Sequence, residues 1–530
     1  EDFFWLSLLA LIYLFFWAPV IDVYPPLSPG DNGRDFYAFW MTFQGKRPCL
    51  DFWWQYGPLM PLYYAFWFLV GGVNLVSVRV GLALNYFLCS FFAYRALRHF
   101  TSALIAFLSS LAFLSFNVTW TYNHIGSIPF LLLSISCLWK FFMTHRARWC
   151  YGAFLSLGGV TLIKVNSGIS SFAALYVLLL LYNGFFLWRH LKAPLRAKHL
   201  VFLPLLFGVL TLGVYGTLYS GLSLSQIGDC LSLGPRYHDR SPLGTNLKHL
   251  ILYFVVWQPK RLMGIGFLLV LTVLAVRGLK KKGLEREKIT LFTFVILSVI
   301  LLGVATTAEY FVIHSIIFRF DFWLFPILVL LAGLGAQWAG FLFPRKVKFC
   351  LAGLLFFLLL RHPYHVFREY LAWRKPERFL AVPHGQVYVE GLQSASSVEV
   401  IRKGTQFILD HTKPEEAILA IPYEPLYCFL SGRHHAVPEL SFTQFIPLAE
   451  GREEPLIRQL EDKPPPYVIL SNRYDSNEPN YGRFGRTHCQ KLAKYIFKHY
   501  EETQTFGPWD PTASEPHAIK IFRRKKTTRR

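Results

Sequence analysis

The chain alternates apolar segments of membrane-spanning length with short polar loops. A bilayer core of about 30 Å is crossed by about 20 apolar helical residues, with roughly 17 to 25 as the working range. On that measure the sequence predicts about eleven transmembrane helices and therefore a polytopic α-helical membrane protein. The predicted spans lie near residues 3–21, 75–94, 101–118, 125–142, 149–165, 167–188, 200–220, 262–277, 289–307, 321–341 and 347–362.

Every second loop between these spans is rich in Lys and Arg and nearly free of acids. The cations of these loops are Arg95 and Arg98; Lys140, Arg146 and Arg148; Arg189, Lys192, Arg196 and Lys198; Arg277, Lys280, Lys281, Lys282, Arg286 and Lys288; and Arg345, Lys346 and Lys348. Only Glu285 and Glu287 oppose them. Because positively charged loops stay in the cytoplasm, we predict that the N-terminus lies inside. Residues 22–74 form the first outer loop, and the segment after residue 362 also lies outside.

The last third of the chain has a different pattern. A helical pattern over 398–411 is followed by short apolar runs at 417–421, 467–470 and 518–522, with a proline-rich break at 463–466. Helices that alternate with buried strands are typical of an α/β domain. The sequence therefore predicts a multispanning domain over residues 1–362 and an extracytoplasmic soluble α/β domain over 363–530.

Composition agrees with a membrane protein. The 530 residues are 53% hydrophobic, 17% aromatic and only 16% charged, with a mean hydropathy of +0.35, which excludes a single soluble domain of this length. Most of the net charge of +22 lies in loops between spans, so it indicates topology rather than nucleic-acid binding. The eight cysteines are scattered without CxxC spacing and predict neither a disulfide framework nor a zinc site. The first span lacks a basic leader and a small-residue cleavage site, so we expect a retained anchor.

The first outer loop contains the clearest candidate chemistry. Asp31 follows a Ser-Pro-Gly turn and precedes residues 32–44, in which aromatic side chains recur at helical spacing. This pattern predicts an amphipathic helix on the outer membrane surface with Asp31 at its start. The apolar run over 59–70 predicts a second, interfacial or partly inserted helix.

The acids and aromatic residues of the first outer loop could also have purely structural roles. Asp31 could be a helix N-cap, and Asp35 a solvated residue on the polar face of the helix. The aromatic residues of 51–58, among them Trp54 and Tyr56, could belong to the interfacial aromatic belt rather than contact a sugar.

Several cations lie on the predicted outer side, where Lys and Arg are normally rare. Lys164 ends the fifth span, Arg319 begins the tenth, and the long loop between the seventh and eighth spans contains a cluster with Arg261. The other members of that cluster are Arg236, Arg240 and Lys260. One explanation is snorkelling by side chains at span ends. The other is a set of fixed donors for the phosphate of a lipid in the outer leaflet. His124, in the second outer loop, faces the same compartment.

The first outer loop resembles that of the C-type glycosyltransferases. The similarity lies in Asp31-Asn-Gly-Arg-Asp-Phe-Tyr-Ala-Phe-Trp40, in Gln44-Gly-Lys-Arg-Pro48, and in Asp51-Phe followed by Tyr56-Gly-Pro-Leu. Within the superfamily the chain resembles bacterial relatives of the protein O-mannosyltransferases and of the lipid A aminoarabinose transferase. The tail run Ile421-Pro-Tyr-Glu-Pro-Leu-Tyr-Cys-Phe-Leu-Ser-Gly-Arg433 is similar to those of bacterial members.

This resemblance implies a fold, a site and a function. It implies the C-type glycosyltransferase fold and places the catalytic carboxylate of the family on Asp31. Many members have a second acid immediately afterwards, whereas this chain has Asn32, so Asp35 is a possible second acid. Lys164 and Arg319 match positions near the polyprenyl phosphate, and we add Arg261 as a third phosphate ligand. The predicted acceptor or sugar contacts are Arg34, His124 and Tyr56.

The resulting hypothesis is a bacterial inner-membrane glycosyltransferase. It would transfer a sugar from a polyprenyl-phosphate donor to an extracytoplasmic protein, lipid or glycan by direct inverting displacement. No cofactor is certain, and a divalent metal is possible. A secondary transporter is an alternative, although the span interiors contain almost no carboxylates. A non-catalytic envelope scaffold is a third interpretation.

Overall fold

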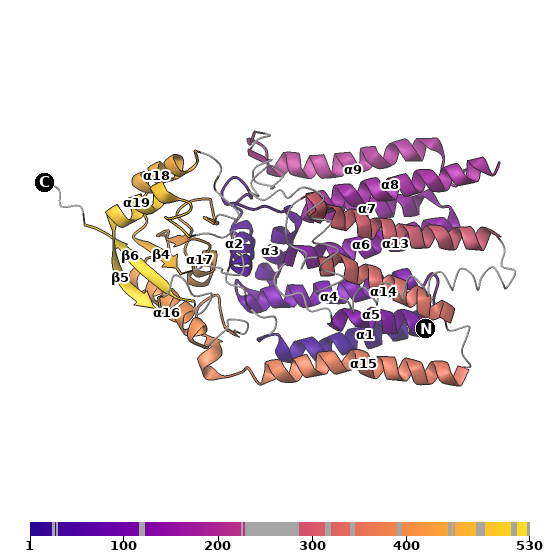
Figure 1. Cartoon of the computed structure of the whole chain (residues 1–530), viewed down its shortest axis with the longest axis horizontal. Helices are drawn as coiled ribbons and strands as arrows, with labels where there is room; N and C mark the ends of the chain where they lie inside the picture. The colour runs from indigo at the N-terminus through magenta and orange to yellow at the C-terminus, as the bar shows by residue number, and fades with distance from the viewer. Residues whose placement is uncertain are drawn as a thin grey trace.

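The structure is a computed structural model. It describes residues 1–23, 27, 30–115, 122–223, 226–227, 286–312, 320–339, 345–389, 395–443, 448, 451–472, 483–509 and 517–526. Long helices lie side by side in a bundle, and a smaller α/β region lies beyond one end of it (Figure 1). Helices α2 (Asp31–Phe43) and α3 (Leu59–Gly71) lie between the two.

The bundle forms where the apolar segments predict it. Its elements are α1 (Asp2–Trp17) with η1 (Ala18–Val20), α4 (Leu75–Leu97), α5 (Ala103–Leu111) with η2 (Ala112–Ser115), α6 (Tyr122–Thr144), α7 (Ala147–Ile163), α8 (Val165–Trp188), α9 (Ala197–Leu218), α13 (Arg286–Val312), α14 (Phe320–Ala339) and α15 (Arg345–Leu371). Each predicted span falls on one of these helices except 262–277, which lies outside the described residues. Within the described part, five helices are long and apolar enough to cross a membrane. The chain is therefore a multi-pass helical membrane protein.

The basic loop between α4 and α5 lies at the end of the bundle away from the α/β region (Figure 1). There, Nε of Arg98 donates to the carboxylate of Asp2 at 2.6 Å, which joins the end of α4 to the start of α1. The backbone N–H of Ser102 donates to the side-chain oxygen of Gln337 at 2.9 Å, which joins the α4–α5 loop to α14. The N-terminus lies at the same end (Figure 1). The side of the membrane that this end faces stays a prediction.

The α/β region contains a mixed sheet and a small ribbon. Its elements are η6 (Pro376–Arg378), β1 (Phe379–Leu380), β2 (Val387–Tyr388), α16 (Ala395–His411), β3 (Leu419–Ile421), α17 (Pro425–Ser431), α18 (Glu453–Asp462), β4 (Tyr467–Ser471), α19 (Gln490–His499), β5 (Tyr500–Phe506) and β6 (Ile519–Arg524). The four-stranded sheet has the order β3-β4-β6-β5; β3 and β4 are parallel and the other pairs antiparallel. The predicted apolar runs at 417–421, 467–470 and 518–522 contain β3 and most of β4 and β6. The domain boundary at residue 362 stays a prediction, and it falls within α15.

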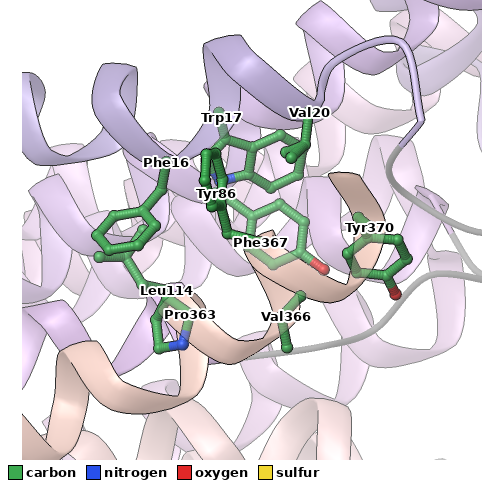
Figure 2. Close-up of a pocket in the computed structure, with 9 residues that line it drawn as sticks. All are labelled: Phe16, Trp17, Val20, Tyr86, Leu114, Pro363, Val366, Phe367 and Tyr370. Atoms are coloured by element: carbon green, nitrogen blue, oxygen red, sulfur yellow. The ribbon is translucent and has the colours of Figure 1, made fainter. Parts of the chain in front are cut away.

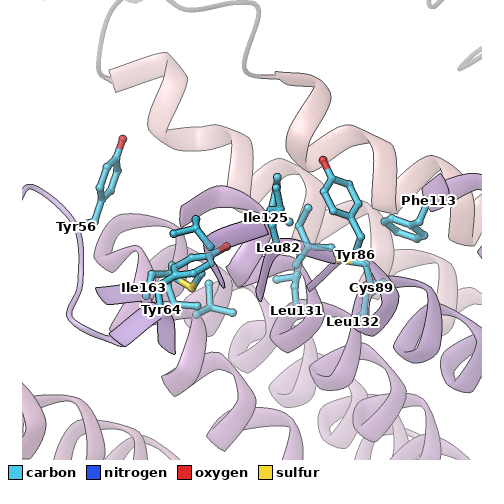
Figure 3. Packing of buried hydrophobic residues seen from close by; sticks show 14 of the residues in the cluster. Tyr56, Tyr64, Leu82, Tyr86, Cys89, Phe113, Ile125, Leu131, Leu132 and Ile163 are labelled. Carbon is cyan, nitrogen blue, oxygen red and sulfur yellow. The ribbon is translucent and has the colours of Figure 1, made fainter. Parts of the chain in front are cut away.

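One hydrophobic core extends from the bundle into the α/β region. It includes Leu82 and Leu131 of the bundle, Phe39 of α2, Phe429 of α17 and Ile519 of β6. Figure 3 shows the close packing of part of this core, with Tyr64, Leu82, Ile125 and Leu131 among the labelled side chains. Because the same cluster contains residues of both regions, the α/β region is packed against the bundle rather than tethered to it.

Helix α2 forms where predicted, but it is not open to the surface. Every residue from 32 to 41 is buried, between α3 on one side and α17 on the other. The ring of Phe39 stacks on that of Tyr64 with centroids 4.3 Å apart, and Phe36 contacts Phe429 at 5.7 Å. Gly33 permits this approach, because a Cβ there would lie 2.7 Å from the backbone nitrogen of Leu426. The polar face of α2 therefore meets protein, which corrects the prediction of a surface helix.

Candidate functional site

Asp31 is the first residue of α2 and its carboxylate faces two donors. Gly30 occupies the N-cap position, so the N-cap interpretation of Asp31 is wrong. Oδ1 of Asp31 accepts hydrogen bonds from the hydroxyl of Tyr423 at 2.9 Å and from Nη1 of Arg34 at 3.2 Å. The side chain is 24% exposed. It is thus held in place and still accessible, as an acid–base group requires.

Arg34 and Asp35 form a buried ion pair next to Asp31. Nε and Nη2 of Arg34 both donate to Oδ1 of Asp35, at 2.9 and 2.6 Å, and the two side chains are 2% and 0% exposed. Burial alone would lower the pKa of Arg34, but the nearby Asp35, Tyr423 and Asp31 raise it well above its ordinary value. Arg34 is therefore a permanent cation, and the interpretation of Asp35 as a solvated residue is wrong.

Aromatic rings extend the site from Arg34 toward α6. The guanidinium carbon of Arg34 lies 5.2 Å from the ring centroid of Tyr56 and 5.9 Å from that of Trp54, within the range of cation–π contacts. Trp54 is fully buried and Tyr56 nearly so, so neither belongs to an exposed aromatic belt. Figure 3 shows Tyr56 apart from the packed core side chains, with its hydroxyl directed away from them.

His124 and Lys164 continue the series of contacts that runs from Asp31 through Arg34 to Tyr56. The rings of Tyr56 and His124 meet edge to face with centroids 6.0 Å apart. Nζ of Lys164 lies 2.8 Å from Nε2 of His124, and both side chains are buried. Lys164 occupies the single extended residue between α7 and α8, so the helix break directs its side chain to His124. This burial argues against snorkelling as the reason for Lys164.

Gly57 fixes the loop that carries Tyr56. Its backbone N–H donates to the carbonyl of Ile163 at 2.8 Å, at the end of α7. A Cβ on Gly57 would lie 2.0 Å from the carbonyl oxygen of Leu162, so no other residue fits. The loop and the α7–α8 break are therefore held together, which brings Tyr56 next to His124.

Six of the predicted site residues thus form one continuous set of contacts, from the acids on α2 to the cation at the α7–α8 break. They are Asp31, Arg34, Asp35, Tyr56, His124 and Lys164. Arg319 and Arg261 lie outside the described residues, and the roles given to all eight residues stay predictions. Within the described part no group of three or more His, Cys, Asp or Glu side chains could hold a metal ion.

Sequence reasoning missed the contribution of the tail to this site. Tyr423 contacts Asp31 and Arg34, the hydroxyl of Tyr37 accepts from the backbone N–H of His435 at 2.9 Å, and the N–H of Trp53 donates to the carbonyl of Pro438 at 2.8 Å. The available signal was the family-like run 421–433, which contains Tyr423. Cys49 of the first loop is disulfide-bonded, which the scattered cysteines did not predict.

A separate pocket lies between α1, α4, η2 and α15 (Figure 2). Its empty volume, including the part open to the surroundings, is about 410 Å³. The lining is formed by Phe16, Trp17, Val20, Tyr86, Leu114, Pro363, Val366, Phe367 and Tyr370. Because none of these side chains is charged, the pocket is unsuited to bind a phosphate.

Comparison with solved structures found proteins of similar fold. No protein-family model and no curated protein matches this chain. ArnT from Cupriavidus metallidurans in the apo state is similar over 98% of this chain and 97% of its own, with a TM-score of 0.55 and 14% identity. The same protein bound to undecaprenyl phosphate is similar over 98% of this chain and 98% of its own, with a TM-score of 0.52 and 13% identity. The Archaeoglobus fulgidus oligosaccharyltransferase in complex with Zn and sulfate is similar over 89% of this chain and 68% of its own, with a TM-score of 0.51 and 12% identity.

These similarities define the class of the fold. The chain has a C-type glycosyltransferase-like fold, as the first-loop resemblance implied. The match to ArnT covers nearly the whole of both chains.

Proposed function

We propose that the protein is an integral membrane glycosyltransferase that uses a polyprenyl-phosphate-linked sugar. The observation that carries this proposal is the convergence of a held, partly exposed carboxylate with two buried cations, within a C-type glycosyltransferase-like fold. ArnT has been crystallised with undecaprenyl phosphate, which supports a lipid phosphate as the donor's leaving group. The acceptor would be an extracytoplasmic protein, lipid or glycan.

Asp31 is the proposed catalytic base. It takes the proton from an acceptor hydroxyl or amine as that group attacks the anomeric carbon of the sugar. The bond between this carbon and the phosphate oxygen breaks, and the polyprenyl phosphate leaves with the electron pair, so one displacement inverts the configuration. A positioned base of this kind supplies about 10² to 10⁴ in rate.

Lys164 is the proposed donor-phosphate ligand, together with Arg319 and Arg261. A fixed cation in a buried site stabilises charge on the departing phosphate without reorganisation. Arg34, Tyr56 and His124 would contact the sugar or the acceptor. We assign Asp35 to holding Arg34, because it is fully buried against that guanidinium.

The proposed location is the bacterial inner membrane, with the N-terminus and the basic loops inside. The site and the α/β region would then lie outside the cytoplasm. The disulfide at Cys49 supports this orientation, because disulfides persist in oxidising compartments such as the periplasm.

The test is a comparison of cells with and without the protein by mass spectrometry of membrane lipids and envelope glycans. Cells that lack it should accumulate a prenyl-phosphate sugar and lose the corresponding sugar from an envelope acceptor. Asp31→Asn should reproduce this loss, with transfer lowered about 10²- to 10⁴-fold.

The matched control is Asp51→Asn. Asp51 lies in the same loop, is exposed, and accepts only a local hydrogen bond from the backbone N–H of Arg47 among the contacts described. Its replacement should leave transfer unchanged. Normal glycans in cells that make the folded Asp31→Asn protein would refute the assignment of the base.

A further inference from the structure

The hydroxyl of Tyr423 bridges the two charged groups at the start of α2. It donates to Oδ1 of Asp31 at 2.9 Å and accepts from Nη1 of Arg34 at 2.9 Å. Nη1 of Arg34 also reaches Oδ1 of Asp31 at 3.2 Å, so the three groups close a triangle. Tyr423 is 3% exposed, and it comes from a part of the chain almost four hundred residues away.

The α/β region holds this hydroxyl in place. Tyr423 follows β3, and the next residue, Glu424, is fully buried with Oε1 accepting from the hydroxyl of Ser471 at 2.8 Å. Ser471 ends β4, the parallel neighbour of β3. On the other side, the carbonyl of Pro422 accepts from the backbone N–H of Phe442 at 2.7 Å. The loop after β3 is thus anchored within the α/β region on both sides of Tyr423.

A hydroxyl that donates to a carboxylate stabilises its ionised form, which is the form that a base requires. Among the described residues, Arg34 and Asp35 on α2 and Tyr423 after β3 are charged or titratable groups near Asp31, with Tyr56 behind Arg34. Arg34 also donates to Oδ1 of Asp31. Loss of the Tyr423 hydroxyl would therefore weaken the ionised state without abolishing it.

We propose that Tyr423 is a positioning residue for Asp31, supplied by the α/β region. Its hydroxyl keeps the carboxylate ionised and orients it toward the acceptor. This inference rests on the proposed function, because it assumes that Asp31 acts as a base. It gives the α/β region a direct part in the site, beyond any selection of acceptors.

The test measures the protonation of Asp31 without any substrate. The full chain in detergent is treated with a carbodiimide and an amine nucleophile, which convert protonated, accessible carboxyl groups into amides. Mass spectrometry then follows the labelling of the peptide with Asp31 as a function of pH. Asp35 is fully buried, and the Asp31→Asn variant shows how much of the signal comes from Asp31.

Tyr423→Phe should move the midpoint of the labelling curve up by about 1 pH unit, because the variant loses a hydrogen bond to the charged form of the carboxylate. The control is Tyr427→Phe. Tyr427 is also buried and its hydroxyl lies 3.0 Å from Nε2 of His517, away from Asp31, so its loss should leave the midpoint unchanged. Equal midpoints for Tyr423→Phe and the unaltered protein would overturn the inference.

A second replacement keeps the ring and the hydroxyl and so protects the fold. Incorporation of 3,5-difluorotyrosine at position 423 makes the phenol a stronger donor, and the midpoint should move down. An unchanged or higher midpoint would contradict the role of the hydroxyl. Because neither measurement needs transfer activity, a midpoint shift without detectable sugar transfer would refute the proposed function while preserving the contact.

Discussion

Two ion pairs of equal length lie at opposite ends of the helix bundle, and they have different consequences. Arg98 and Asp2 approach to 2.6 Å at the basic-loop end, with side chains 26% and 40% exposed. Arg34 and Asp35 also approach to 2.6 Å, at the end that meets the α/β region, but are 2% and 0% exposed. Exposed pairs contribute about 0 to 1 kcal/mol, whereas an uncompensated buried charge costs several. The distance alone therefore says little about the importance of a pair.

The comparison separates two uses of charge in this chain. At the loop end, the cations are numerous and on loops, as expected for residues that set topology. At the junction, a few charges are buried, interlinked and placed beside the candidate base. Burial, rather than the number of charges, distinguishes the end that carries the candidate site.

The largest expected effect is the loss of the buried pair. Asp35→Asn should lower the free energy of unfolding by about 3 to 5 kcal/mol, because Arg34 stays buried with less negative charge nearby. Asp2→Asn should cost less than about 1 kcal/mol. Thermal unfolding of both variants in the same detergent checks the difference. Similar melting temperatures for the two would remove the distinction between the ends.

A smaller effect is expected from the glycine that joins the loop to the α7–α8 break. Gly57→Ala should destabilise the protein by about 1 to 3 kcal/mol, because the new Cβ meets rigid backbone. It should also separate Tyr56 from His124 and so reduce transfer. Gly213→Ala in α9 is the control, since a Cβ there meets nothing within 4 Å. If both variants melt alike, the close approach at Gly57 has been misjudged.

The smallest effect concerns the pH dependence of the junction. Burial lowers the pKa of His435 below its ordinary value of about 6.5. The unfolded chain then binds more protons than the folded chain, so stability is present above about pH 6.5 and is lost as the pH falls toward the lowered value.

Thermal unfolding between pH 8 and pH 5 measures this loss. We expect a decline of about 1.4 kcal/mol per pH unit at most from this group, and a flatter profile in His435→Gln. His411→Gln, which replaces an exposed histidine, should keep the original slope. A His435→Gln profile as steep as that of the unaltered protein would show that His435 does not contribute.

Much of the fold was predictable because it depends on local pattern. Span length and the period of apolar residues located the bundle helices, and short apolar runs located β3, β4 and β6. The acids and cations on the outer side also marked residues that the structure places together, such as Asp31 and Lys164. Asp31 was marked by its place after a turn at the start of a helical run, and Lys164 by its position on the side where Lys and Arg are normally rare.

The remainder depended on contacts between distant segments. No period in residues 31–43 indicates that α17 covers this helix, so the sequence pattern suggested a membrane surface instead. The contact of the Tyr423 hydroxyl with Asp31 was not predicted for the same reason, because the sequence around Tyr423 does not show which distant residue its hydroxyl contacts. The contact of Gly57 with the end of α7, next to the helix break at Lys164, likewise joins segments that are far apart in the sequence.

The bridge between Asp31 and Tyr423 also constrains how the protein matures. Asp31 leaves the ribosome almost four hundred residues before Tyr423. A half-made chain in the translocon would contain the acid without its partner. The carboxylate therefore gains its second donor only after the α/β region has been translated, so the site is completed late in synthesis.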